Sequence, residues 1–384
     1  MSNFVRVFLF ASGVLLFQDV DSARSSPCPC SDEKLCQRIT KEVDKEVLVW
    51  STSDKVWQHY NWSVVTTVAV FGDWNDELMC FAHSKGVKVV LVGFFNVNDL
   101  SNTSKCEEWV DGLITKAIAV HADGVNLDLE GPISKGSKEV NLLNELTADV
   151  YKTFKDKLPG SQVTFDVAWS PDCIDGRCYD VATLSKSVDF LAIMSYDEMS
   201  QIFGPECTAY ANSPFNKTKS GVSKYMDLGI PANKLVLGLP WYGYDYQCIA
   251  VTGVDTCHIK KVPYQGANCS DAAGKQVAYS TINDLLLTRT ESGRKWDAGS
   301  QSPYFDYYDM SNQRHQMWYD DPQSLGIKLA YAVDIGLKGA AVWNSDLLDY
   351  SALKRSIAQT KDMWVTLSSI KEKKNKNYKH SIDI

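Results

Sequence analysis

Residues 123–130, Asp-Gly-Val-Asn-Leu-Asp-Leu-Glu, constrain the fold of this chain more than any other segment. Polar and aliphatic residues alternate along it. In a β-strand alternate side chains share one face, so Asn126, Asp128 and Glu130 point the same way. The flanking sequence indicates a parallel barrel strand that is buried on both faces. Three polar side chains in such a place are costly, which favours a functional site over an acidic edge strand.

The position of Glu130 supports a functional role for this strand. Glu130 is followed directly by Gly131-Pro132, so we expect it at the carboxyl end of the strand. Enzymes built on parallel β/α barrels place their active sites at this end. Asp128 lies one pleat below Glu130. Asp123 has the opposite parity and stands at the strand entrance, where we expect a structural role.

Seven further apolar or β-branched runs have the character of buried strands. Helical periodicity separates several of them, for example where Leu143, Leu146, Val150 and Phe154 recur on one helix face. Eight strands that alternate with helices predict an α/β protein, a (β/α)8 TIM barrel over residues 24–365. The eight runs are residues 47–50, 66–71, 88–94, 124–130, 162–169, 188–196, 235–241 and 339–343.

One connection is too long for a simple barrel. The interval between the seventh and eighth runs far exceeds a βαβ unit, which needs about 30 residues. Residues 245–315 within this interval contain Cys248, Cys257 and Cys269 together with many aromatic residues. We therefore expect a small insertion there, tied by disulfides, above the mouth of the barrel.

The two ends of the chain differ in character from the barrel. Residues 1–23 have a basic start and a short apolar core, as a secretory signal peptide does. Residues 366–384 are polar and basic, so we expect a disordered tail. Beyond the leader no apolar run approaches the length of a transmembrane helix, and we expect no membrane partner.

Glycosylation sites and cysteines indicate the compartment. Acceptor sequences for N-glycans occur at Asn61, Asn102, Asn216 and Asn268, which agrees with passage through the secretory pathway. The eleven cysteines suit disulfides in an oxidising compartment, and their odd number leaves at least one thiol free or paired between chains. The paired Cys-x-x-Cys spacing of zinc sites is missing, and the histidines are scattered. We expect no metal ion and no cofactor.

The charge of the chain argues against nucleic acid as a partner. The formal net charge is −8 and the isoelectric point is about 5.3, whereas binding to phosphates needs a basic surface. An acidic balance suits a sugar hydrolase. We expect the protein to be a monomer.

The segment 123–130 resembles the signature of the family-18 glycoside hydrolases, Asp-x-x-Asp-x-Asp-x-Glu. Asn126 stands where the family usually has a second Asp. The resemblance covers residues 47–353. One departure lies in the third run, where residues 91–95, Leu-Val-Gly-Phe-Phe, replace the small residues of the family's Ser-x-Gly-Gly. The chain is therefore a divergent member by this comparison.

Three later segments extend the resemblance. Residues 192–197, Ala-Ile-Met-Ser-Tyr-Asp, resemble the family's Met-x-Tyr-Asp motif at the end of the sixth strand. Residues 238–243, Gly-Leu-Pro-Trp-Tyr-Gly, resemble its Gly-x-Pro-x-Tyr-Gly element at the end of the seventh. Residues 339–343 end in Trp343, at the end of the eighth.

The resemblance implies a mechanism and a set of site residues. Glu130 is implied as the general acid, in a reaction where the 2-acetamido oxygen of the substrate is the nucleophile. Asp128 would hold the acetamido N–H, and Tyr196 would donate its hydroxyl to the acetamido oxygen. The implied substrate-binding residues are Asn126, Met194, Asp197 and Trp343, with Trp343 under the sugar ring.

Two classes of function fit these residues. The first is a glycosidase that cleaves GlcNAc-β1,4-GlcNAc bonds in chito-oligosaccharides or chitobiose-core glycans. The closest resemblance is to lysosomal members that release GlcNAc from the reducing end of the chitobiose core of Asn-linked oligosaccharides, and a secreted endo-chitinase is the alternative. The second class is a non-catalytic chitinase-like lectin. Such lectins lack the acid, so the presence of Asp128 and Glu130 favours the hydrolase.

Overall fold

The computed structural model describes residues 27–372 apart from residue 291, and its centre is a closed barrel of eight parallel strands. The order around the barrel is β1-β15-β7-β6-β5-β4-β3-β2. The predicted (β/α)8 fold is therefore confirmed. The expected leader lies outside the described residues. The barrel strands are β1 (Glu46–Ser51), β2 (Thr67–Val70), β3 (Lys88–Gly93), β4 (Gly124–Leu127), β5 (Gln162–Ala168), β6 (Phe190–Met194), β7 (Leu235–Pro240) and β15 (Gly339–Trp343).

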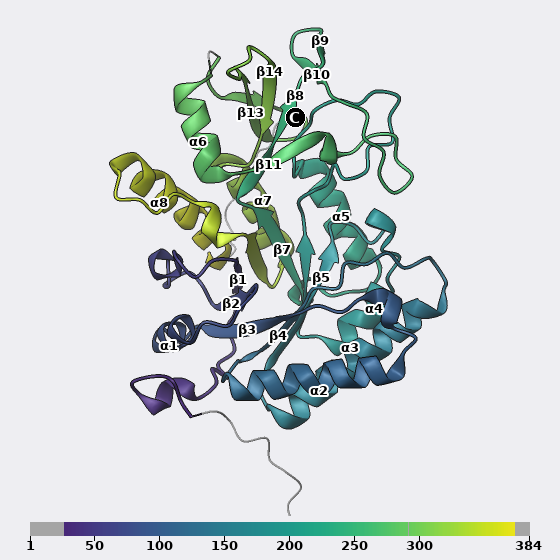
Figure 1. Cartoon of the computed structure of the whole chain (residues 1–384), viewed down its shortest axis with the longest axis vertical. Helices are drawn as coiled ribbons and strands as arrows, with labels where there is room; N and C mark the ends of the chain where they lie inside the picture. The colour runs from purple at the N-terminus through teal and green to yellow at the C-terminus, as the bar shows by residue number, and fades with distance from the viewer. Residues whose placement is uncertain (1–26, 291, 373–384) are drawn as a thin grey trace, which may run out of the picture.

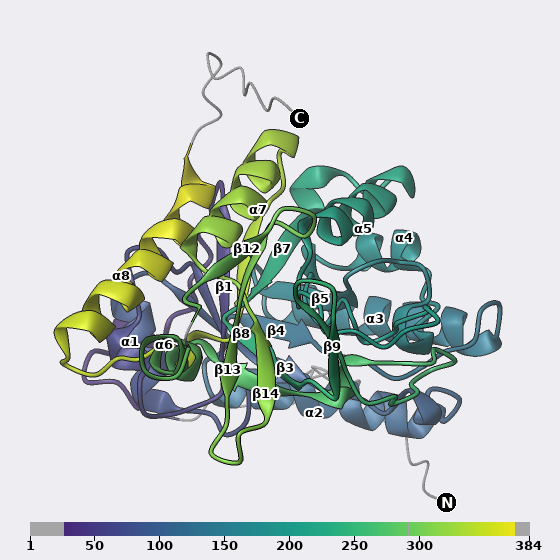
Figure 2. The same ribbon diagram turned by 90° about the horizontal axis from the view of Figure 1, so that it is seen from above.

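Helices lie around the barrel, as Figure 2 shows. The predicted face of α3 is buried, with Leu143, Leu146, Val150 and Phe154 packed in the core between strands and helices. None of the helices in the described part of the chain is long and apolar enough to cross a bilayer. The helices around the barrel are α1 (Asp76–Ser84), α2 (Thr103–Ala119), α3 (Lys138–Lys157), α4 (Val181–Leu184), α5 (Phe215–Asp227), α7 (Pro322–Ile335) and α8 (Lys354–Ser368).

The interior of the barrel is packed with side chains from alternate strand positions. β1 contributes Leu48 and Trp50, while β6 and β15 contribute the smaller residues Ala192 and Ala341. Such layers make the barrel a solid core, on which loops at one end can be held in place.

The insertion between β7 and β15 forms a second sheet at one end of the barrel (Figure 1). The strand order β11-β8-β14-β13-β12 is antiparallel throughout, and β9 and β10 form a separate hairpin. The sheet extends slightly beyond the expected range 245–315. The elements of the whole insertion are β8 (Tyr242–Gln247), β9 (Ala250–Thr252), β10 (Thr256–His258), β11 (Gly274–Ala278), α6 (Tyr279–Thr288), β12 (Lys295–Asp297), β13 (Ser302–Tyr308) and β14 (Arg314–Trp318).

The C-terminal segment is ordered further than expected. A 3₁₀ turn, Ser369–Lys371, continues directly from α8. Leu367 and Ile370 are buried in the main core, because apolar residues continue at helical spacing past the end of the expected barrel. Residues 366–371 therefore belong to the barrel, and the predicted tail starts too early. Residues 373–384 lie outside the described part.

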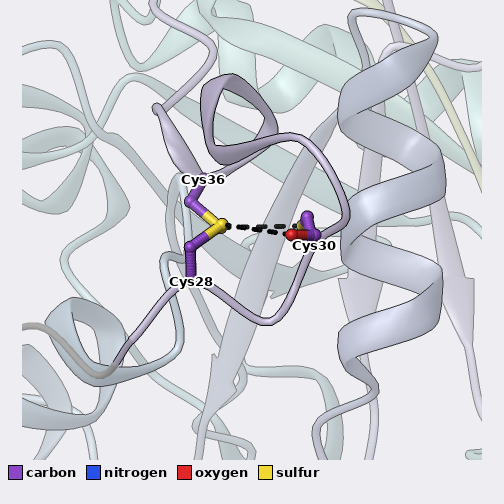
Figure 3. Close-up of side chains that lie close together, drawn as sticks. All are labelled: Cys28, Cys30 and Cys36. Atoms are coloured by element: carbon purple, nitrogen blue, oxygen red, sulfur yellow. Dashed lines mark hydrogen bonds between the residues drawn. A yellow bond between two sulfur atoms is a disulfide. The ribbon is translucent and has the colours of Figure 1, made fainter.

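The cysteines form five disulfides, and Cys106 is a free thiol. Figure 3 shows Cys28, Cys30 and Cys36, whose sulfur atoms lie close together near the N-terminus. All three sulfurs are already in disulfides, so none is available as the thiolate that binds a metal. The pairs are Cys28–Cys36, Cys30–Cys80, Cys173–Cys178, Cys207–Cys269 and Cys248–Cys257.

Asp123 ties the amino-terminal end of the barrel together. Its carboxylate accepts hydrogen bonds from the backbone N–H groups of Ile39, at 2.7 Å, and Val89, at 2.6 Å. The imidazole Nε2 of His83 lies 2.8 Å from Asp123 Oδ2, the oxygen that also accepts from Val89, and both side chains are fully buried. Asp123 thus has a structural position, at the end of the barrel opposite to Asp128.

Candidate active site

A cavity of about 420 Å³ lies at the carboxyl ends of the barrel strands, within the usual size range of small-molecule sites. Its lining includes residues from the ends of β1 and β15 and from the loops after β2, β3, β4, β5 and β6. The insertion adds one residue from β11. The lining residues are Trp50, Phe71, Phe94, Asp128, Glu130, Asp166, Trp169, Asp175, Arg177, Met194, Tyr196, Asp197, Gln276 and Trp343.

Asp128 and Glu130 lie beyond the end of β4, contrary to the expectation that they belong to the strand. β4 ends at Leu127, because the neighbouring strand β3 ends at its partner Gly93. The Asp128 N–H still donates to the carbonyl of Gly93 at 3.0 Å, and the ladder stops there. Glu130 is therefore on a loop, and its side chain is 52% exposed.

Asn126 lies inside the barrel, below the cavity. Trp50 Nε1–H donates to Asn126 Oδ1 at 2.8 Å, so the amide nitrogen of Asn126 must face the other way. That nitrogen donates to Thr164 Oγ1 at 2.9 Å and to Asp166 Oδ1 at 2.8 Å. The expected contact of Asn126 with substrate is not supported, because its amide is fully buried and bonded to protein groups. Asn126 instead holds Trp50 and Asp166, which line the cavity, through its hydrogen bonds.

Asp128 holds an unused acceptor in the cavity. Among the described residues, no hydrogen-bond donor reaches its buried Oδ1 atom. Burial and the charge of Glu130 raise the pKa of Asp128 to about 7, although Arg177 acts in the opposite direction. Burial and the nearby Asp128 also raise the pKa of Asp166 well above its usual range. At mildly acidic pH Asp128 therefore holds a proton, and the shift of the Asp166 pKa favours its neutral form.

Three of the predicted site residues come from the end of β6 and the segment that follows it. Met194 is the last residue of the strand, and Tyr196 follows it, buried at the cavity wall. Asp197 accepts hydrogen bonds from the hydroxyls of Tyr242, at 2.6 Å, and Tyr244, at 3.0 Å. Burial raises the pKa of Asp197, against the effect of the two tyrosine hydroxyls. These bonds join the barrel loop to the first strand of the insertion.

Aromatic side chains form the opposite side of the cavity. Trp343 ends β15, and its ring lies 5.8 Å from that of Trp50 and 4.9 Å from that of Phe71, both in edge-to-face contact. Phe94, from the divergent third run, lies 5.1 Å from Phe71 and is half-exposed. The bulky replacement therefore adds to the cavity wall. An aromatic wall facing convergent polar groups is typical of a ligand site.

The structure brings together all the predicted site residues except Asn126, and adds others. Asp166 could have been found from the sequence, because residues 164–168 show polar and apolar alternation in a buried strand, as the segment before Glu130 does. Arg177 could not, because it lies in the loop between Cys173 and Cys178, which has no periodic pattern.

Residues 65–347 match the family model described as glycosyl hydrolases family 18. The chain belongs to this family and is a glycoside hydrolase. It is 44% identical over 354 residues to the di-N-acetylchitobiase of Rattus norvegicus, covering 92% of this chain and 96% of that protein. It is 43% identical over 345 residues to the di-N-acetylchitobiase of Homo sapiens, covering 90% and 89%.

The fold also matches solved structures of distant relatives. A chitinase from Chromobacterium violaceum superimposes with a TM-score of 0.66 at 17% identity, covering 86% of this chain and 100% of that chain. At this identity the likeness concerns the fold alone.

The raised pKa of Asp128 predicts a pH-dependent effect on stability. The folded state holds this proton up to about pH 7, whereas an unfolded Asp loses it near its ordinary value of 3.8. The folded protein therefore loses stability as the pH rises between these values. Asp128→Asn removes the ionisable group, so we expect it to raise the melting temperature at pH 8 and to change it little at pH 4.

Differential scanning calorimetry at the two pH values measures this difference. The exposed Asp54→Asn is the matched control, for which we expect no difference between the two pH values. An equal effect of Asp128→Asn at pH 4 and pH 8 would contradict the account.

Proposed function

We propose that this protein hydrolyses GlcNAc-β1,4-GlcNAc bonds by substrate-assisted catalysis with retention of configuration. Its substrate is the chitobiose core of Asn-linked oligosaccharides, from whose reducing end it releases GlcNAc as a monomeric enzyme. One observation carries the proposal: the buried Asp128 Oδ1 has no donor among the described residues and belongs to a residue two positions from Glu130. A buried acceptor without a donor is costly, and the N–H of a 2-acetamido group can satisfy it.

Glu130 is proposed as the acid. Its carboxyl lines the cavity and is half-exposed, so it can reach a glycosidic oxygen bound there. General acid catalysis by a positioned carboxyl contributes about 100- to 10,000-fold to the rate.

The other carboxyl groups of the cavity are poor candidates for an enzyme nucleophile. The pKa of Asp128, about 7, keeps this group protonated in mild acid, and the raised pKa of Asp166 favours its neutral form. Asp175 is paired with Arg177 at 2.9 Å, and Asp197 is held by two tyrosine hydroxyls. This arrangement supports a nucleophile that belongs to the substrate, its own 2-acetamido oxygen.

The proposed reaction has two steps. First, the acetamido oxygen bonds to the anomeric carbon while the bond to the leaving oxygen breaks, and the proton of Glu130 passes to that oxygen. Asp128 accepts the acetamido N–H, and Tyr196 donates its hydroxyl to the acetamido oxygen. Second, water gives a proton to Glu130 and adds to the anomeric carbon. The bond between this carbon and the acetamido oxygen breaks, which opens the ring that the first step formed. Two displacements at one carbon give net retention.

The walls of the cavity suit the sugar ring. Trp343 offers an aromatic surface, and Met194 lies on another strand end that lines the cavity. Asp197 also lines the cavity, and its proposed role is to accept a hydrogen bond from a sugar hydroxyl.

The chitobiose substrate and the lysosome are supported by the relatives and by the acid–base properties of the site. The relatives named di-N-acetylchitobiase are matched over most of their length. The raised pKa values of the cavity carboxyls favour their protonated forms in an acidic compartment. We therefore propose lysosomal delivery through the secretory pathway, with secretion as the alternative. Three predicted glycan sites, Asn102, Asn216 and Asn268, are exposed.

Chitotetraose labelled isotopically at its reducing end tests the proposed specificity. We expect labelled monosaccharide as the first labelled product at mildly acidic pH, identified by mass spectrometry. Labelled disaccharide as the first product would indicate an endo-chitinase instead. Intact substrate, despite measurable binding, would indicate a lectin.

Substitution of the acid tests the role of Glu130. Glu130→Gln keeps the shape of the side chain but removes its proton, so we expect turnover to fall about 100- to 10,000-fold. Binding of chitotriose, measured by calorimetry, is expected to persist. The exposed Glu107→Gln is the control with unchanged turnover. Turnover of Glu130→Gln near the wild-type rate would remove Glu130 from the mechanism.

A further inference from the structure

The strand β4 does not by itself fix the position of Glu130. β4 ends at Leu127, and the Glu130 side chain is half-exposed. A catalytic group must nevertheless be held to within about 0.5 Å of its working position. Another part of the chain must therefore hold the loop after β4.

The loop after β5, residues 173–179, is attached to both sides of Glu130. The hydroxyl of Tyr179 lies 2.8 Å from the carbonyl oxygen of Leu129 and 2.6 Å from that of Gly131, which flank Glu130 in the chain. Further along, Ile133 forms a parallel bridge with this loop through two backbone hydrogen bonds. The disulfide Cys173–Cys178 closes the loop on itself.

Arg177 extends this attachment to the Glu130 side chain. Its Nη1 lies 2.5 Å from Glu130 Oε2, and its Nη2 lies 2.9 Å from Asp175 Oδ2. The Arg177 side chain is only 8% exposed. Because Asp175 and the closed loop fix the guanidinium, its geometry does not depend on a flexible surface side chain. Charge-assisted bonds of this kind are stronger than neutral ones.

Arg177 is also the one basic residue among the described residues that line the cavity. The ionisable groups that face Glu130 otherwise carry negative charge or none. They come from the loop after β4, from β5 and the loop after it, and from the loop after β6. In chain order they are Asp128, Asp166, Asp175, Tyr179, Tyr196 and Asp197.

We propose that Arg177 is a positioning residue for the acid: it binds one oxygen of the Glu130 carboxyl, so that the other oxygen delivers the proton to the glycosidic bond. This inference rests on the proposed role of Glu130. The contact has a second consequence. When Glu130 has given up its proton, it is an anion beside Asp128. The guanidinium then stabilises this anion, so that stabilisation does not depend on water alone.

Two substitutions of Arg177 distinguish the effect of its positive charge from the effect of its guanidinium geometry. Arg177→Met removes the charge, and Arg177→Lys retains it without the fork that binds both carboxylates. The matched control is Arg355→Met, which removes an exposed arginine paired with Asp284 on the surface. The measurement is kcat and KM for chitobiose across pH 3 to 9, with the melting temperature of each variant.

We expect Arg177→Met to lower kcat by about 10- to 100-fold, the effect of a slightly misplaced catalytic group, and to change KM little. Loss of the positive charge beside Glu130 should also move the alkaline limb of kcat/KM to higher pH. Arg177→Lys should keep the limb of the wild type and part of kcat. A limb that does not move in Arg177→Met would reduce Arg177 to a structural residue.

A second readout does not require turnover. The carboxyl carbon signal of Glu130 in ¹³C-glutamate-labelled protein can be assigned by its loss in Glu130→Gln. We expect it to titrate at a higher pH in Arg177→Met than in the wild type, and to be unchanged in Arg177→Lys. A wild type that does not cleave chitobiose would overturn the proposed function alone. An unchanged titration in a folded Arg177→Met would overturn the role of Arg177.

Discussion

The site depends on a hydrogen bond in the middle of the barrel, from the Asn126 amide to the Asp166 carboxyl. The indole N–H of Trp50 fixes which way the amide faces, so its N–H groups must point to β5. Three strands, β1, β4 and β5, are thereby joined through their inward side chains. This buried network forms the bottom of the cavity, where Asp128 Oδ1 has no hydrogen-bond donor among the described residues.

The same network explains how the barrel tolerates several buried carboxyl groups. A second Asp in place of Asn126 would add a negative charge next to Asp166 and Asp128, whereas the amide adds donors without charge. Burial then raises the pKa values of Asp128 and Asp166, which favours the neutral form of each group in mild acid. A buried neutral acid costs far less than a buried anion. The site is therefore suited chemically to acidic conditions, which agrees with the proposed lysosomal location.

Much of the fold could be predicted from the sequence because each barrel strand is buried on both faces and reads as an apolar run. Asp128 and Glu130 were recognisable because polar groups are exceptional in such a run. The end of β4 could not be predicted, since it depends on where its neighbour β3 ends at Gly93. The contact of Arg177 with Glu130 joins loops after two different strands, and no local pattern encodes it. The order of residues 366–371 was missed because the basic tail beyond them dominated their composition.

In the proposed mechanism the acetamido group of the substrate is the nucleophile, held by Asp128 and Tyr196. The most direct measurement is kcat/KM for chitobiose derivatives with zero, one, two or three fluorine atoms on the acetamido methyl group of the non-reducing sugar. Fluorine withdraws electrons from the acetamido oxygen while changing its size little. We expect a steep, progressive fall in kcat/KM along the series. Equal values across the series would contradict it and would point to a nucleophile supplied by the enzyme.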